Sequence, residues 1–146
     1  MAARGRAISA PATRGTVIVV EDDELIRLTL SEGLTDAGFN VIDAVDSADA
    51  LMLIGMGATG IHALVTDNNM PGTIKGVALT RLVRETWPWI HLVVAAQLID
   101  PTAVLPFGCR YFPKPYLIAD VIRHLRALGR PAEAAPPSGS SAAASS

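Results

Sequence analysis

The sequence has little cysteine and no long apolar run. Its single cysteine, Cys109, excludes an internal disulfide, which fits a reducing compartment, and we interpret it as a buried structural thiol. No apolar stretch approaches the ~20 residues that span a bilayer, and the N-terminus lacks the apolar core of a secretory signal. The absence of both kinds of segment predicts a soluble, cytoplasmic protein.

Positive charge is also scarce in the body of the chain. Residues 16–130 hold nine Lys or Arg against thirteen Asp or Glu, a balance of −4 that gives no electrostatic footprint for nucleic acid. Residues 1–15 carry three arginines and no acid, and we predict a disordered basic leader. The Pro, Ala and Ser of residues 130–146 predict a disordered tail. One globular domain over residues 16–129 remains.

Apolar segments alternate with amphipathic ones through this domain. Apolar, often β-branched runs predict five strands, at 16–20, 39–45, 61–66, 90–96 and 110–112. Helical spacing of apolar residues predicts four helices, at 24–37, 48–58, 77–86 and 118–128. Ser47 is expected to cap the second helix, and the prolines and glycine of 97–109 leave room for only a short or distorted helix there. Five βα units predict a doubly wound parallel sheet with helices on both faces.

Charged residues follow the strands at their carboxyl ends. Glu21 and Asp22 come after the first strand, Asp67 after the third and Lys114 after the fifth. Taken alone, Asp67 could simply begin a turn and Lys114 could be a solvated loop lysine. In a parallel sheet, however, these ends share the edge at which ligands bind. Clustered carboxylates repel one another unless a cation lies between them, and their hard oxygen ligands suit Mg²⁺. An aspartate beside a metal ion and an ammonium can accept a phosphoryl group.

Three motifs, "VIVVEDDE", "LVTDNNMPG" and "FPKPY", resemble in order and spacing the receiver domain of two-component response regulators. The resemblance covers roughly residues 16–129. It implies a flavodoxin-like sheet of strand order 2-1-3-4-5. It also implies that Asp67 is the phosphoacceptor and that Lys114 is the lysine of the family, whose bond to the following proline is often cis in relatives.

The resemblance implies a metal site as well. Mg²⁺ would be bound directly by Asp22 and Asp67, through water by Glu21, and by the backbone carbonyl of Asn69. Asp23 would then face the first helix instead of the metal.

One position departs from the family pattern. The family ends its fourth strand with Thr or Ser, whose hydroxyl binds the phosphoryl group, whereas this chain has Ala95. Residues 93–98 contain no Ser or Thr, so a shifted alignment does not restore the hydroxyl. Tyr111 falls at the aromatic switch position of the family. We therefore expect a weakened switch in a chain that retains its acceptor.

These motifs predict a single-domain response regulator with no separate enzymatic output. Asp67 would accept a phosphoryl group from a sensor histidine kinase or phosphotransfer protein, and output would pass through another protein. The 17 residues after Gly129 are too few and too polar for a DNA-binding helix-turn-helix. No nucleic acid and no membrane are expected as partners.

Two alternatives remain open. Ala95 favours a degenerate receiver that binds partners without phosphorylation. A phosphohydrolase with an aspartyl intermediate is disfavoured, because such enzymes usually carry a second Asp where this chain has Asn69. Met52 and Met56 lie at helical spacing and are expected to pack in the core.

Overall fold

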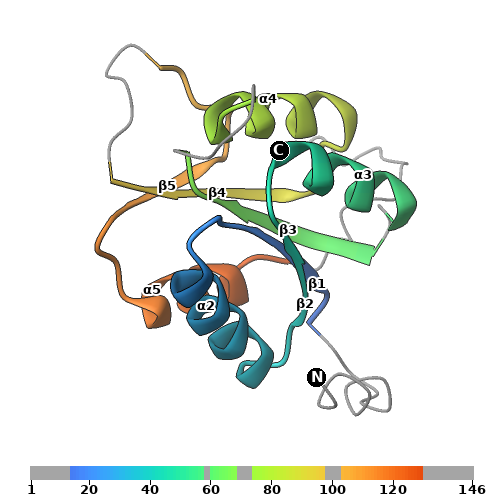
Figure 1. Ribbon diagram of the computed structural model, residues 1–146. Helices are drawn as coiled ribbons and strands as arrows, with labels where there is room; N and C mark the ends of the chain where they lie inside the picture. Colours follow the sequence, from blue (N-terminus) through green and yellow to red (C-terminus); the bar gives the residue numbers. More distant parts are fainter. Residues whose placement is uncertain (1–13, 58–59, 69–73, 98–102, 130–146) are drawn as a thin grey trace.

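The structure is a computed structural model that describes residues 14–57, 60–68, 74–97 and 103–129. Its centre is a five-stranded parallel sheet of order β2-β1-β3-β4-β5 (Figure 1). The strands are β1 (Thr16–Val20), β2 (Asn40–Ala44), β3 (Ile61–Thr66), β4 (His91–Ala96) and β5 (Arg110–Pro113). The helices are α2 (Glu24–Asp36), α3 (Ser47–Gly57), α4 (Gly76–Thr86) and α5 (Ile118–Ala127). The predicted doubly wound, flavodoxin-like sheet and its strand order are confirmed.

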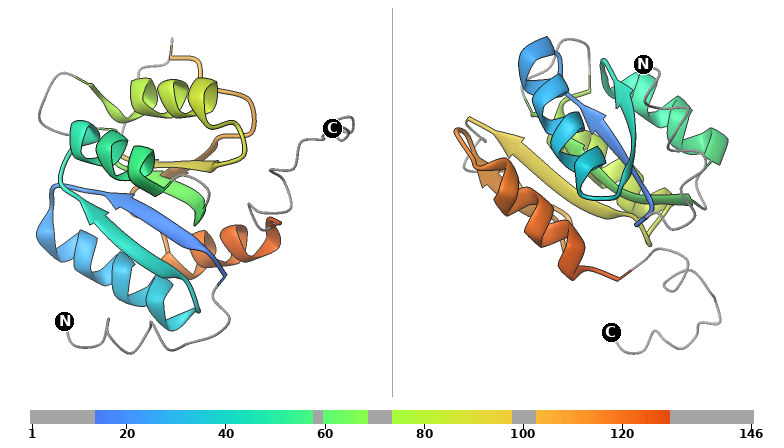
Figure 2. Two further views of the ribbon diagram at one scale, coloured as in Figure 1. Left: turned by 90° about the vertical axis from the view of Figure 1, so that its right-hand side faces the viewer. Right: turned by 90° about the horizontal axis from the view of Figure 1, so that it is seen from below.

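The helices form a layer on each face of the sheet. Figures 1 and 2 show α2 and α5 on one face and α3 and α4 on the other. Along β1, Val17 and Val19 pack with α2 and α5, whereas Ile18 and Val20 pack with α3 and α4. Successive strand residues point to opposite faces, and both faces are covered, so the whole strand is apolar.

Arg84 and Cys109 lie at the α4 side of this core. The Nη1 atom of Arg84 donates to the carbonyls of Pro88 and Ile90, which joins the end of α4 to the start of β4. Cys109 is half-buried against the same core, and burial raises the pKa of its thiol to about 11. The thiol is therefore protonated at neutral pH, in keeping with a structural role.

Some local predictions were wrong. Asp46, not Ser47, caps α3, because the Asp46 side chain accepts a hydrogen bond from the backbone N–H of Asp49 at 2.8 Å. Ser47 is occupied elsewhere, since its hydroxyl donates to the carbonyl of Ile74 at 2.9 Å. Met52 and Met56 are 58% and 77% exposed and do not belong to the core.

The connection from β4 to β5 contains no helix over residues 103–109, and residues 98–102 lie outside the described part. Two nitrogens of Arg81 on α4 hold this connection by donating to the carbonyl of Val104, Nε at 3.0 Å and Nη2 at 2.6 Å.

Within the ranges that the structure describes, no helix has both the length and the apolar character needed to cross a bilayer.

Candidate functional site

Asp67 lies one residue beyond β3, at the carboxyl edge of the sheet. Its backbone N–H donates to the carbonyl of Val20 at 3.0 Å, which continues the pairing of β3 with β1. Gly76 at the start of α4 packs against the backbone of Asp67 and Asn68, where a Cβ would overlap both residues. The side chain of Asn68 accepts the N–H of Val77 at 2.9 Å. The start of α4 therefore holds the chain just after Asp67 in place.

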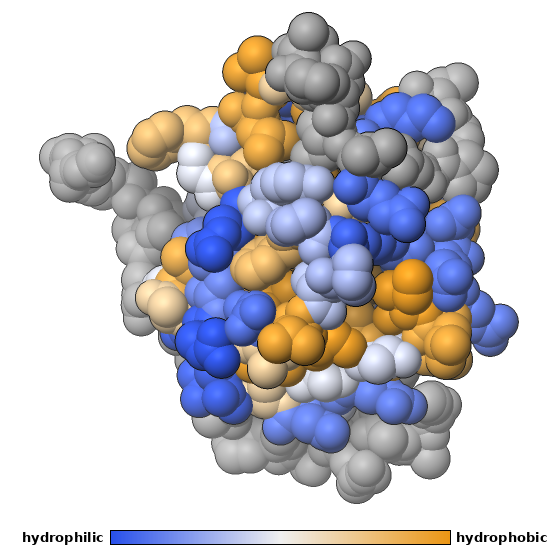
Figure 3. Space-filling model, turned by 90° about the vertical axis from the view of Figure 1, so that its left-hand side faces the viewer, coloured by the Kyte–Doolittle hydropathy of each residue, from blue (hydrophilic) through white to orange (hydrophobic). Residues whose placement is uncertain are grey.

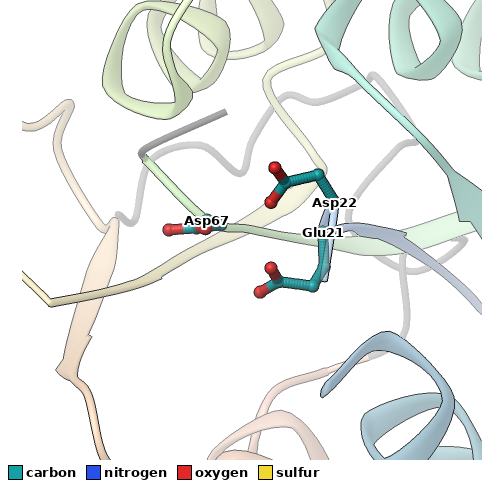
Figure 4. Close-up of side chains that lie close together, drawn as sticks. All are labelled: Glu21, Asp22 and Asp67. Carbon is teal, nitrogen blue, oxygen red and sulfur yellow. The ribbon is translucent and has the colours of Figure 1, made fainter. Parts of the chain in front are cut away.

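Glu21, Asp22 and Asp67 form an acidic cluster. One carboxylate oxygen from each lies within 4.8 Å of the other two. Figure 4 shows the three side chains extending to the same side, beyond the ends of β1 and β3. Asp23 turns away, as predicted, because its Oδ1 accepts the N–H of Ile26 at 3.0 Å and caps α2.

Lys114 adds an ammonium to this site. Its Nζ lies 3.0 Å from Glu21 Oε1 and 3.4 Å from Asp67 Oδ2. The backbone N–H of Lys114 donates to the carbonyl of Ala96 at 3.0 Å, so the ladder between β4 and β5 positions the lysine. The bond between Lys114 and Pro115 is cis, as the resemblance implied. Among these four side chains, three carboxylates meet one ammonium, so negative charge is in excess.

Burial and the neighbouring groups both shift the pKa values of Glu21 and Lys114. Burial raises the pKa of Glu21 and the nearby Asp67 carboxylate adds to the effect, although hydrogen bonds from Asp23 and Lys114 act in the opposite direction. Burial alone would lower the pKa of Lys114, but the hydrogen bond and charge of Glu21, with the charge of Asp67, outweigh it and raise the pKa. Lys114 therefore stays protonated.

The donor set fits Mg²⁺. All three side chains of the acidic cluster offer carboxylate oxygens, the hard ligands that this ion takes at about 2.0–2.1 Å. The three carboxylate oxygens lie within 4.8 Å of one another, close enough for one ion that keeps several of its waters to be shared among them. A bound cation would also offset the negative charge that Lys114 leaves unbalanced.

The structure places the remaining predicted residues as follows. Ala95 is buried on the side of the sheet that α2 and α5 cover. In the pairing of β4 with β5 it lies opposite Phe112. Tyr111 pairs with Val94, and its hydroxyl donates to the carbonyl of Ala96 at 3.2 Å. The tyrosine therefore already contacts the end of β4. Asn69, the predicted carbonyl ligand, lies outside the described residues.

A groove of about 460 Å³ beside Lys114 was not predicted from the sequence. Leu25 and Ile26 of α2 line one side of it, and Tyr116 and Ile118 line the other. Figure 3 views the molecule from the side of the strands' carboxyl ends and shows apolar side chains gathered among hydrophilic ones. The sequence held one signal for it, because Leu25 falls outside the four-residue spacing of Ile26, Leu30 and Leu34 along the same helix. In the structure its side chain is 74% exposed.

Fold and site together define a doubly wound α/β protein with an acidic cluster and a lysine at the carboxyl edge of its sheet. The sequence model of the response regulator receiver domain matches residues 17–125. The chain belongs to this family, whose members are the receiver domains of response regulators in two-component systems.

Two curated relatives are transcriptional regulatory proteins. The uncharacterized transcriptional regulatory protein YrkP of Bacillus subtilis is 35% identical over 117 residues, which cover 75% of this chain and 49% of the relative. PrrA of Mycobacterium leprae is 33% identical over 118 residues, which cover 78% of this chain and 49% of the relative. The chain thus spans about half the length of the curated relatives it matches.

Solved structures show the same fold. A response regulator receiver protein from Sinorhizobium medicae has a TM-score of 0.70 and 25% identity, and the match covers 82% of this chain and 95% of that one. TrrA from Thermotoga maritima, solved in complex with Mg²⁺ and BeF, has a TM-score of 0.68 and 20% identity. That match covers 77% of this chain and 97% of TrrA.

Proposed function

We propose that Asp67 accepts a phosphoryl group in a Mg²⁺-dependent two-component phosphorelay. The observation that carries this proposal is the position of Lys114 Nζ, 3.0 Å from Glu21 and 3.4 Å from Asp67. A nucleophilic carboxylate, further carboxylates for a cation, and an ammonium for the phosphoryl oxygens then lie in one site. This is the combination that phosphoryl transfer to a carboxylate needs.

The reaction is a displacement at phosphorus. A carboxylate oxygen of Asp67 attacks, the new O–P bond forms, and the P–N bond of a phosphohistidine or phosphoramidate donor breaks. The electron pair leaves with the nitrogen, which takes up a proton. The ammonium of Lys114 stabilises the charge on the transferred oxygens.

Asp22 and Asp67 would hold Mg²⁺ directly and Glu21 through water, with the carbonyl of Asn69 as the further ligand. When bound, the ion would supply positive charge that offsets the charge of the phosphoryl oxygens. Glu21 suits an indirect role, because Lys114 and the N–H of Asp23 already occupy its two oxygens.

The donor partner is a sensor histidine kinase or a phosphotransfer protein. The groove of Leu25, Ile26, Tyr116 and Ile118 supports a protein donor, since it offers apolar contacts beside Lys114. The output passes to another protein through contacts that the phosphoryl group changes. A single-domain protein without a nucleic-acid partner stays a prediction, because the relatives named above are transcriptional regulators of about twice the matched length.

Ala95 favours a second candidate, a degenerate receiver that binds partners without phosphorylation. It lacks the hydroxyl that would bind the transferred group, and Tyr111 already contacts the end of β4. The intact cluster of Glu21, Asp22, Asp67 and Lys114 favours the first candidate.

Mg²⁺ is expected to stabilise the fold, because it binds only the native arrangement of the acidic cluster. At 100 times its dissociation constant the gain in free energy of unfolding is about 2.7 kcal/mol. Thermal melting with and without Mg²⁺ measures it. Asp22→Asn should lose most of the gain. Asp23→Asn is the matched control, since asparagine also caps a helix and Asp23 faces α2. An equal gain in the Asp22 variant would place the metal elsewhere.

Ala95→Thr is expected to enlarge the conformational response to beryllofluoride, a stand-in for the phosphoryl group. The added hydroxyl can donate to that group, and a hydrogen bond to a charged group contributes about 1.5–3 kcal/mol. A ligand shifts an equilibrium only by its differential affinity for the two states, so this bond strengthens the switch. Amide chemical shifts over β5 and α5 measure the response.

Ala95→Val is the control for the threonine variant, because valine adds the same volume beside Phe112 without a hydroxyl. A wild-type protein that already shows the full shift, or a valine variant that responds as strongly as threonine, would contradict the role of the missing hydroxyl.

A further inference from the structure

The outer face of α3 carries no charged side chain. From Ala50 to Thr66 the sequence contains no Asp, Glu, Lys or Arg. Ala48, Met52, Gly55 and Met56 follow one another at helical spacing and are all exposed. Asp49, the one acid of the helix, is half-buried and accepts the N–H of Val45 at 3.2 Å. The left view of Figure 2 shows α3 on the outside of the molecule.

The other helices differ from α3 in this respect. Each of them carries exposed charged side chains. These are Glu24 and Glu32 on α2, Arg81 and Glu85 on α4, and Arg123 and Arg126 on α5. A helix of a globular protein normally turns its charged side to water. An exposed methionine-bearing face without charge is instead typical of an interaction surface.

The lack of charge also limits what can cover this face. A partner that placed a charged side chain on it would lose the hydration of that charge and find no counter-charge. The same face of a second copy is equally uncharged and is therefore complementary to itself. Apart from the backbone of its own helix and its chain neighbours, the described residues place no heavy atom within 4 Å of the position that a Cβ would take at Gly55, so its surface is open to a side chain from outside.

We propose that α3 packs antiparallel against α3 of a second copy around a two-fold axis. In such an isologous contact each copy uses the same residues. Met52 and Met56 of one copy would cover Gly55 of the other, where the missing side chain allows the backbones to approach closely. In an antiparallel pair the partly positive N-terminus of each helix also lies near the partly negative C-terminus of the other, which is favourable.

The size of the helix predicts how strong this dimer is. An α3 of 11 residues is about 16 Å long at 1.5 Å per residue. The surface area that a contact of that length buries is well below the roughly 800 Å² per partner of a standard stable interface. We therefore expect a weak dimer, with a dissociation constant on the order of 100 µM.

The proposed dimer is independent of the phosphoacceptor site. α3 runs antiparallel to the strands, so Met56 lies toward the end of the sheet away from Asp67. The surface also belongs to the opposite layer from the groove beside Lys114, which α2 and the segment before α5 line. Asp67→Asn should consequently leave self-association unchanged, and failure of the phosphorelay proposal would not remove this one.

Sedimentation velocity of the full chain from about 10 µM to 1 mM brackets the expected dissociation constant and tests the dimer. The wild-type sedimentation coefficient should rise with concentration, and Met56→Lys should raise the dissociation constant at least tenfold. Val104→Lys is the matched control, because Val104 is 67% exposed on the segment before β5 and should leave the dimer intact. Met52→Lys repeats the test at a second position.

Three results would overturn the proposal. One is a wild-type chain that stays monomeric over the whole range. Another is self-association that persists unchanged in both methionine variants. The third is equal weakening by Val104→Lys, which would place the contact on another surface. Because Met56 is 77% exposed, its variant should keep the wild-type melting temperature at low concentration.

Discussion

Asp67→Asn is expected to abolish phosphoryl transfer to this chain. The amide is a poor nucleophile. Glu21, the other buried carboxylate of the acidic cluster, is engaged by Lys114 and by the N–H of Asp23. Incubation with phosphoramidate and Mg²⁺ followed by intact mass measurement should show the added phosphoryl group in wild type and none in the variant.

The variant should remain folded, so the loss can be assigned to chemistry. Lys114 keeps its 3.0 Å contact with Glu21, and removal of one charge relieves repulsion in the acidic cluster. Asp120→Asn is a suitable control, because Asp120 is an exposed carboxylate paired with Arg123 at 2.8 Å on α5. Phosphorylation of the Asp67 variant at the wild-type rate would remove Asp67 from its proposed role.

Gly76→Ala is expected to destabilise the fold and to disturb the candidate site together. A Cβ at this position would overlap the backbone of Asp67 and Asn68, which cannot move aside as a flexible side chain could. Overpacking of this kind typically costs about 1–3 kcal/mol. Denaturant unfolding measures the cost. If Mg²⁺ also raises the free energy of unfolding of this variant by less than it does for wild type, Asp67 has been displaced.

Gly55→Ala provides the matched comparison for Gly76→Ala. Both glycines lie in helices, but no described residue outside the helix comes within 4 Å of the position of a Cβ at Gly55. Alanine there should stabilise the fold by about 0.5–1 kcal/mol, because glycine inside a helix carries an entropic cost. The comparison is made at low concentration, where self-association through α3 does not contribute. Equal effects of the two substitutions would show that helix propensity, not the contact with Asp67, governs position 76.

The sequence predicted the sheet and the meeting of charged residues at its carboxyl edge, because both depend on local patterns. β1 is apolar on both faces, which marks a strand covered on two sides. The position of charged residues directly after the strands followed from chain order alone. Parallel strands bring those ends together whatever the details of packing, and so Glu21, Asp67 and Lys114 were expected to meet.

Features that depend on distant contacts were missed. The choice of Asp46 over Ser47 as the cap of α3 involves the bond from Ser47 to Ile74, which is 27 residues away. Exposure of Met52 and Met56 could not be predicted, because helical spacing shows that two residues share a face but not whether that face is covered. The register that pairs Ala95 with Phe112 is likewise a property of the assembled sheet.

Locating the phosphoryl group by peptide mass analysis tests the central claim most directly. The wild-type chain is treated with phosphoramidate in the presence or absence of Mg²⁺, the acyl phosphate is reduced with borohydride, and the digested peptides are fragmented. We expect the modified residue to be Asp67, and we expect it only in the sample that contained Mg²⁺. Modification at a histidine or at another carboxylate, or equal modification of Asp67 without the metal, would contradict the account.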